Sequence, residues 1–275
     1  MKAYIELVRA PAALTVPGDA VAGAAAAGWP FGRRTLGLTG ASVCLYWAGM
    51  ALNDYADRHL DAMERPERPI PSGRIKPGAA LGVATGLTAG GLGIAAAAGG
   101  KNALRVALPL AATVWAYDFV LKETVFGPVA MAATRVLDVL LGAGGARAAL
   151  PAALTVGAHT LAVTALSRSE VHGARPALPA ATLAATAGVR VAAGRVGPLA
   201  SALLGTYAVT TGRAQYDAVR DPVAPKIRRA VGAGIHGMIP LQAGLIARTG
   251  AWRSALAVAA AFPIARALSR KVSPT

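Results

Sequence analysis

The side chains best suited to chemistry form an acidic segment that closes an apolar run. Five of the 13 acidic residues fall within fourteen positions, namely Asp54, Asp57, Asp61, Glu64 and Glu67. On a helix, Asn53, Asp57 and Asp61 follow one another at intervals of four residues. Asp54 lies three residues before Asp57 and joins them within an arc of about 100°. Carboxylates this close repel one another unless a cation lies between them, and Mg²⁺ typically binds one or two carboxylates together with substrate phosphates.

The composition of the chain is that of a membrane protein, with 55% apolar and 15% charged residues and a mean hydropathy of +0.48. Apolar blocks rich in Ala and Gly permit close helix–helix approach in lipid, and they lack the polar faces of a soluble bundle. They predict helices over 10–28, 36–54, 78–99, 103–121, 125–146, 150–166, 178–193, 197–212, 230–247 and 251–268. We therefore expect one all-α domain over residues 1–275, a polytopic membrane bundle of nine to ten transmembrane helices.

The net charge of +15 comes mostly from Arg, and its distribution predicts an orientation. With ten spans and a cytoplasmic N-terminus, 18 Lys and Arg residues fall on the cytoplasmic side and nine on the other. This bias predicts that the acidic segment faces the cytoplasm, in an integral membrane protein of the bacterial inner (plasma) membrane. Because the basic residues are dispersed among membrane loops, we do not expect nucleic-acid binding.

The acidic segment and its surroundings resemble the UbiA superfamily of intramembrane prenyltransferases. The resemblance rests on Asn-Asp-x-x-Asp-x-x-x-Asp at 53–61, on Arg-Pro-Ile-Pro-Ser-Gly at 68–73, and on Tyr117 followed by Lys122. It implies a helical bundle around a central cavity, in which two facing Asp-rich motifs hold a polyprenyl diphosphate through Mg²⁺. The expected activity is transfer of the isoprenoid to a small acceptor, and the expected partners are that diphosphate, the acceptor and membrane lipid.

The chain departs from the family at the second motif. Where relatives place Asp-x-x-x-Asp between the sixth and seventh helices, residues 166–175 contain a single carboxylate, that of Glu170. Glu170 is a candidate metal ligand, and His172 a candidate general base or hydrogen-bond donor, since His suits Mg²⁺ poorly. A solvated turn is the alternative. Asp217 and Asp221 also have the spacing of a metal site, but ion pairing with neighbouring Arg and Lys explains them better.

The resemblance and the charges assign roles to the remaining candidates. Metal ligands would be Asp54, Asp57, Asp61 and Glu170, and catalytic groups Asp57, Asp61, Glu170 and His172. Asn53, Arg65, Arg68, Lys122, Arg9 and Tyr117 would bind the diphosphate or the metal ligands. Arg offers a planar fork to phosphate oxygens and Lys a compact charge. The alternative for each basic residue is an anchor at the membrane surface.

Further alternatives remain at the sequence level. Arg135 and Asp138, three residues apart within an apolar block, are either an internal ion pair or a site near the acceptor. The chain could also be a non-catalytic transporter or lipid-binding protein on the same scaffold. A CDP-alcohol phosphotransferase would need an Asp-Gly-x-x-Ala-Arg segment that the sequence lacks. Acceptor, isoprenoid length and oligomeric state are not determined by the sequence.

Overall fold

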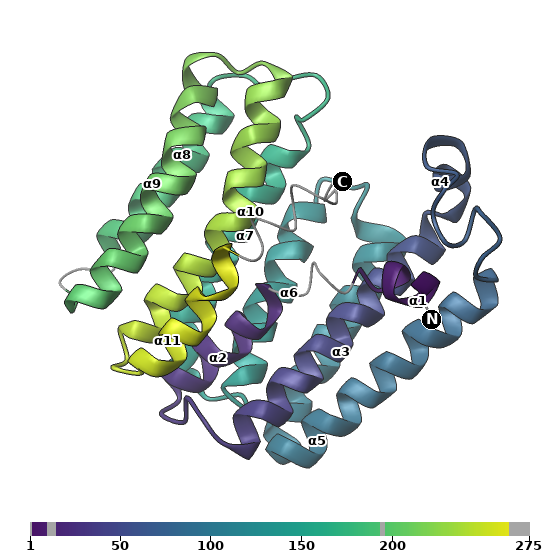
Figure 1. Cartoon of the computed structure of the whole chain (residues 1–275), viewed down its shortest axis with the longest axis horizontal. Coiled ribbons are helices and arrows are strands. Elements are labelled where there is room, and N and C mark those ends of the chain that lie inside the picture. Colours follow the sequence, from purple (N-terminus) through teal and green to yellow (C-terminus); the bar gives the residue numbers. More distant parts are fainter. Residues whose placement is uncertain (1, 10–14, 193–195, 264–275) are drawn as a thin grey trace.

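The protein is an all-helical bundle in a computed structural model that describes residues 2–9, 15–192 and 196–263 (Figure 1). Its α-helices are α1 (Lys2–Leu7), α2 (Val16–Ala26), α3 (Arg33–Ala56), α4 (Arg58–Glu64), α5 (Pro77–Ala116), α6 (Gly127–Gly142), α7 (Leu150–Ser167), α8 (Ala177–Ala192), α9 (Pro198–Arg220), α10 (Ala224–Ala247) and α11 (Trp252–Ala259). A π-helical turn, η2 (Tyr117–Leu121), follows α5, and a 3₁₀ turn, η3 (Arg147–Ala149), precedes α7. The predicted fold class is confirmed.

Most predicted helices are present, with several differences. The short α1 was not predicted, because six residues are too few to show a helical period. α9 extends to Arg220 and α10 starts at Ala224, so most of the loop expected between residues 213 and 229 is helical. The predicted helices 10–28 and 251–268 lie partly outside the described residues.

The two helices predicted over 78–99 and 103–121 form the element α5, which bends at Gly100. Gly100 has φ 65° and ψ −157°, a conformation that glycine adopts without a Cβ penalty. The bend divides α5 into a first arm, 77–99, and a second arm, 101–116. After the bend, the second arm runs back along α3 towards the end of the bundle at which α5 starts.

Both arms pack closely on α3. An added Cβ on Gly37 would lie 2.5 Å from the Ala98 Cβ, and Gly91 faces Leu45, so the first arm runs antiparallel to α3. On the second arm, Val114 faces Gly49, and the arm therefore runs parallel to α3. This arrangement brings the last residues of the second arm beside the last residues of α3.

α3 and α5 form a first group of helices. A second group, α7 to α10, packs beside α6, and α2 lies between the two groups (Figure 1). α2 and α6 are in direct backbone contact, since a Cβ on Gly142 would lie 2.1 Å from the Ala20 carbonyl oxygen. In the same region Arg135 pairs with the buried Asp19 of α2 at 2.8 Å. Arg135 thus forms an internal ion pair between helices, with Asp19 of α2 in place of Asp138. The alternative of a site near the acceptor stays a prediction.

Four described helical stretches are long and apolar enough to cross a membrane: 33–56, 77–121, 147–167 and 224–247. The second of these contains both arms of α5. Several of the other helices are shorter, such as α2 with 11 residues and α8 with 16. The number of transmembrane passes stays a prediction.

The polar connections after α3, η2, α7 and α9 lie at one end of the bundle (Figure 1). Arg168 donates a hydrogen bond to the Thr124 carbonyl at 2.5 Å, which joins two of these connections. Arg228 donates to the Glu170 carbonyl at 2.8 Å and joins a third. We call this end of the bundle the polar end.

We expect the polar end to face the cytoplasm, because the basic residues are concentrated there. In a Cys44→Ser background, a cysteine replacing the exposed Glu64 should resist an impermeant thiol reagent added outside intact cells. A cysteine replacing Thr249, in the exposed turn after α10 at the other end, should be labelled. The opposite pattern would show an inverted topology.

Candidate active site

The acidic segment spans the junction of α3 and α4. α3 ends at Ala56, and Asp57 has φ −86° and ψ 3° before α4 begins at Arg58. The backbone hydrogen bonds nevertheless keep a helical spacing, from Asp57 N–H to Asn53 at 2.9 Å and from Asp61 N–H to Asp57 at 2.8 Å. The predicted helical spacing is thus preserved through a local distortion at Asp57.

One pair of carboxylates shares the guanidinium of Arg68. The Arg68 Nη1 donates to Asp61 Oδ2 at 2.7 Å and lies 3.4 Å from Asp54 Oδ1. Both carboxylate side chains are only 4% exposed, so the guanidinium offsets charge that water reaches poorly. The Ser72 hydroxyl holds the loop in place by donating to the Arg68 carbonyl at 2.6 Å.

A second pair of carboxylates shares the amide of Asn53. Its Nδ2 donates to Asp57 Oδ2 and to Asp118 Oδ1, each at 3.2 Å. Lys122 also forms an ion pair with Asp57. Asp118 and Lys122 come from the π-helical turn η2 and the residue that follows it, and such turns are frequent at functional sites.

Asp118 was missed by the sequence analysis. The available signal was a lone carboxylate at the end of an apolar block, where an unpaired charge is costly. We call Asp54, Asp57, Asp61 and Asp118 the acidic cluster.

Arg9 reaches the acidic cluster from the N-terminal segment. Its Nη2 lies 2.9 Å from Asp54 Oδ1 and 3.3 Å from Asn53 Oδ1. Arg9 has φ 45°, unusual for a residue other than glycine, and strain of this kind is often found at functional sites. The position of α1 is fixed by buried Leu7 and by an ion pair between Glu6 and Arg74.

The donor set suits a hard divalent cation. No group of three or more His, Cys, Asp or Glu side chains in the described part of the chain is arranged to hold a metal ion. However, Mg²⁺ bound with a phosphate needs only one or two carboxylates. Nη1 of Arg68 already lies between two carboxylate oxygens, which shows that a cationic group fits there.

Comparison with known proteins agrees with this geometry. Residues 14–226 match the UbiA prenyltransferase family. The chain belongs to this family. The matched region contains the acidic cluster, Arg68 and Lys122, and it ends before most of α10.

The curated relatives have a common name, digeranylgeranylglyceryl phosphate synthase. The Methanopyrus kandleri protein is 39% identical over 129 residues, 45% of this chain and 45% of that relative. The Methanospirillum hungatei protein is 42% identical over 77 residues, 28% of each chain. The matched segments thus span less than half of these relatives.

Solved structures share the fold over nearly their whole length. One, described as giving structural and mechanistic insights into the biosynthesis of digeranylgeranylglyceryl phosphate synthase in membranes, has a TM-score of 0.68 and 16% identity, and covers 90% of this chain and 98% of its own. A UbiA homologue from Archaeoglobus fulgidus bound to DMAPP and Mg²⁺ has a TM-score of 0.64 and 18% identity, with 94% and 99% coverage. The chain therefore has the UbiA fold and is an integral membrane protein.

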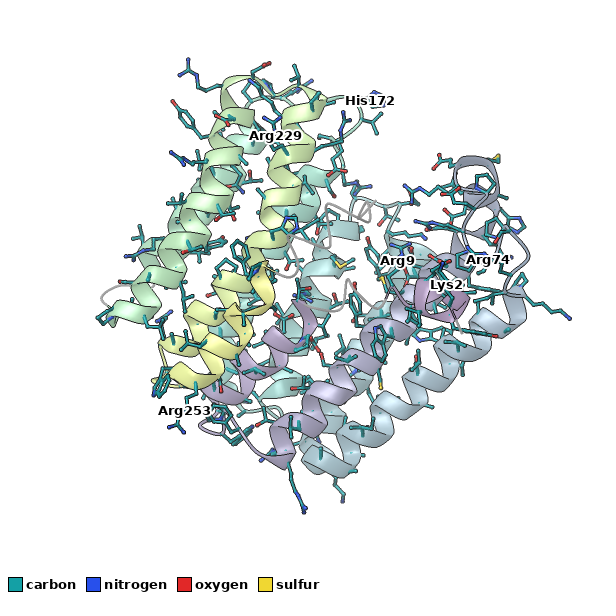
Figure 2. The ribbon with its side chains drawn as sticks, in the orientation of Figure 1. Lys2, Arg9, Arg74, His172, Arg229 and Arg253 are labelled. Carbon is teal, nitrogen blue, oxygen red and sulfur yellow. The ribbon has the colours of Figure 1, made fainter. Side chains whose placement is uncertain are left out.

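The structure does not gather all predicted site residues around the acidic cluster. Arg65, at the end of α4, forms no side-chain hydrogen bond or ion pair within the described residues. Tyr117 is half-buried at the start of η2, and no hydrogen bond joins its hydroxyl to the described part of the site. His172 is exposed on the loop after α7, apart from Arg9 (Figure 2). Its predicted role as a general base gains no support from this position.

Glu170 lies on the same loop at the polar end. Its carbonyl accepts the Arg228 hydrogen bond, while burial raises the pKa of its carboxyl and the Arg228 guanidinium opposes that shift. It does not complete a group of metal ligands with the acidic cluster in the described structure. Asp221 pairs with Lys226 at 3.0 Å, as expected from sequence.

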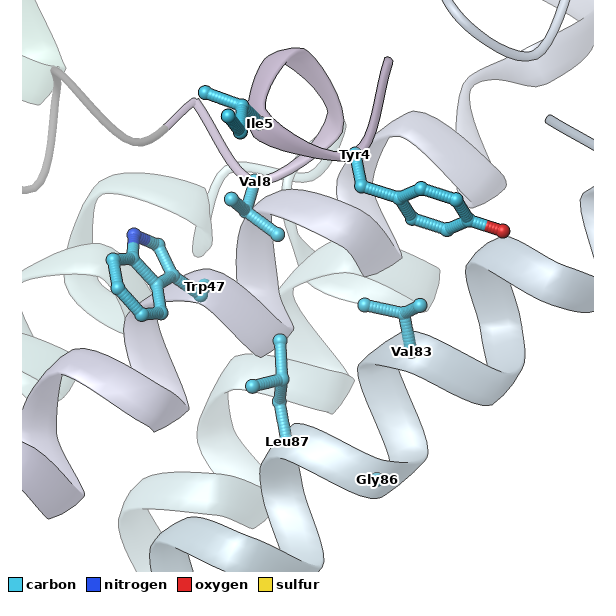
Figure 3. Close-up of a pocket in the computed structure, with 7 residues that line it drawn as sticks. All are labelled: Tyr4, Ile5, Val8, Trp47, Val83, Gly86 and Leu87. Carbon is cyan, nitrogen blue, oxygen red and sulfur yellow. The ribbon is translucent and has the colours of Figure 1, made fainter. Parts of the chain in front are cut away.

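An apolar groove adjoins the site under α1 (Figure 3). It has a volume of about 690 Å³, with Val8 at its α1 side, Trp47 on α3, and Val83 and Leu87 on the first arm of α5. Val8 precedes Arg9, whose guanidinium reaches Asp54 of the acidic cluster. The central cavity implied by the resemblance stays a prediction.

Arg68 and Arg65 form a matched pair for testing the site. Arg68→Gln leaves two poorly hydrated carboxylates without their guanidinium, and we expect the free energy of unfolding to fall by about 2–4 kcal/mol. Arg65→Gln should change it by less than about 0.5 kcal/mol. Thermal or denaturant unfolding in detergent measures both. Equal stability of the two variants would contradict the role of Arg68.

Proposed function

We propose that this protein is a Mg²⁺-dependent prenyltransferase that moves an isoprenoid from a polyprenyl diphosphate to a small acceptor within the membrane. The observation that carries this proposal is the acidic cluster with Arg9, Arg68 and Lys122 directly bonded to it. Family membership supports it, and so do the name of the curated relatives and the DMAPP and Mg²⁺ bound by the Archaeoglobus fulgidus homologue.

The chemistry requires stabilisation of a leaving anion. Breaking the bond between the allylic carbon and oxygen places negative charge on the diphosphate, and Mg²⁺ supplies compensating positive charge when bound. Asp54 with Asp61, or Asp57 with Asp118, would hold the ion. Asn53 keeps the second pair together.

The basic residues complete the diphosphate site. Arg68 and Arg9 would offer planar forks to phosphate oxygens, and Lys122 a single ammonium. The apolar groove under α1 and the apolar helix faces would exclude water from the allylic carbon, so that the acceptor rather than water captures it.

The finer assignments extend this proposal. Residues 1–275 act as one integral-membrane domain, with the polar end at the cytoplasmic face, where charged diphosphate substrates are available. The name of the curated relatives makes a glyceryl phosphate lipid the first acceptor to test. A non-catalytic lipid-binding protein is the second candidate, favoured by the single carboxylate in the loop after α7. Release of diphosphate from labelled substrate distinguishes the two.

Metal dependence tests the acidic cluster. With excess EDTA, diphosphate release and prenyl diphosphate binding should be lost and should return when Mg²⁺ is added. Asp57→Asn should lower turnover by about 100-fold or more, since it removes charge next to the leaving group. Asp217→Asn, at an exposed site on α9, is the control and should leave turnover unchanged. Full activity in EDTA would reject the proposal.

Glu170 tests the divergent loop. If its carboxylate does part of the work of two Asp residues in relatives, Glu170→Gln should lower turnover by roughly 10- to 1000-fold. Glu170→Asp should have a milder effect. Asp221→Asn removes a carboxylate that pairs with Lys226 and serves as control. Normal turnover in Glu170→Gln would show that the acidic cluster holds the metal alone.

A further inference from the structure

Three carboxylates of the acidic cluster each hold a basic side chain from a different segment. The pairs are Asp54 with Arg9 at 2.9 Å, Asp61 with Arg68 at 2.7 Å, and Asp57 with Lys122. Arg9 follows α1, Arg68 lies in the loop after α4, and Lys122 follows η2. We call these three basic residues the counter-ions. Three negative and three positive groups cancel formally, so these six side chains have no net charge.

This neutral arrangement affects a divalent cation that arrives alone. The cation would bind carboxylates that are already paired, through one oxygen each, with the counter-ions. Each counter-ion that it displaces is at most 31% exposed and therefore regains little water. The released charge then lies beside the metal, with like-charge repulsion. Binding of the metal alone is therefore opposed.

A diphosphate that arrives alone meets the opposite difficulty. The counter-ions are already occupied by carboxylates, and moving them to the phosphate oxygens leaves the carboxylates unpaired. The carboxylate side chains of Asp54 and Asp61 are each only 4% exposed, so their unpaired charge would be costly. When metal and diphosphate arrive together, both difficulties disappear, because the metal replaces the counter-ions and the diphosphate receives them.

We propose that Arg9, Arg68 and Lys122 exchange partners during substrate binding, moving from the carboxylates to the diphosphate as the metal takes their place. The exchange rests on the proposed function and adds a thermodynamic statement to it. Metal and prenyl diphosphate bind with positive coupling, so each raises the affinity for the other by the same factor. The coupling arises from the chain's own ion pairs and not only from contact between the two ligands.

Lys122 gives the sharpest test, because its variant has effects of opposite sign on the two ligands. Lys122→Met keeps the length of the side chain and removes its charge. Mn²⁺ alone, measured by EPR titration, should bind about 10-fold more tightly, since one competitor is gone. Geranyl diphosphate, measured by calorimetry with saturating Mn²⁺, should bind about 10-fold more weakly. Lys122→Arg should restore both affinities towards those of the wild type.

The control is Lys226→Met, which removes a basic residue paired with exposed Asp221 outside the acidic cluster. It should change neither affinity. Weaker binding of both ligands in Lys122→Met would show a merely structural lysine, and unchanged Mn²⁺ affinity would show a lysine that contacts only phosphate. Either result overturns the exchange. Independent binding of the two ligands to the wild type also overturns it while leaving the proposed function intact, whereas no geranyl diphosphate binding at all rejects both.

Discussion

Buried carboxylates at the end of an apolar helix are costly unless positive charge or a hydrogen-bond donor lies beside them, and this requirement organises the polar end of the bundle. Asp54 and Asp61 are nearly inaccessible to water, so a guanidinium must lie beside them. Supplying that charge requires α1, the loop after α4 and the end of η2 to converge on α3. The fold near the site can be understood as the arrangement that brings three separate cations to one helix end.

The distant parts of the bundle serve the same arrangement through close packing. Glycines on α3 and on the first arm of α5 let the helices approach until backbone and side chain are in contact. The close contact between α2 and α6 connects the two groups of helices in the same way. Lipid tails are as apolar as the side chains, so burying those side chains between helices gains little free energy. Close packing is therefore a main source of helix association in the membrane.

The sequence predicted the elements better than the pairings between them. The membrane bundle and the acidic segment followed from apolar blocks and motif spacing. The resemblance to the UbiA superfamily pointed to Arg68 and Lys122, which lie beside the acidic cluster, and their roles stay predictions. Asp118 and Asp19 were missed because each is a lone acid in an apolar block, and its partner comes from another helix. The partner of Arg135, Asp19, could not be found from sequence for the same reason: spacing along one helix says nothing about a carboxylate on its neighbour. Arg68 opens the Arg-Pro-Ile-Pro-Ser-Gly element and Arg65 lies outside it, and the path of the loop places Arg68 beside the carboxylates.

The bend at Gly100 restricts how the length of this chain can change during evolution. The first arm of α5 starts near the polar end and the second arm ends there, leading directly into Asp118 and Lys122. One residue inserted within the second arm would rotate everything after it by about 100° and carry both side chains away from α3. A residue added at the bend lengthens only the turn, which lies about 24 Å from the site along the second arm. It leaves the helical phase of the second arm unchanged. Insertions and deletions among homologues should therefore be concentrated at the bend. Those inside the second arm should come in groups that restore a whole number of helical turns.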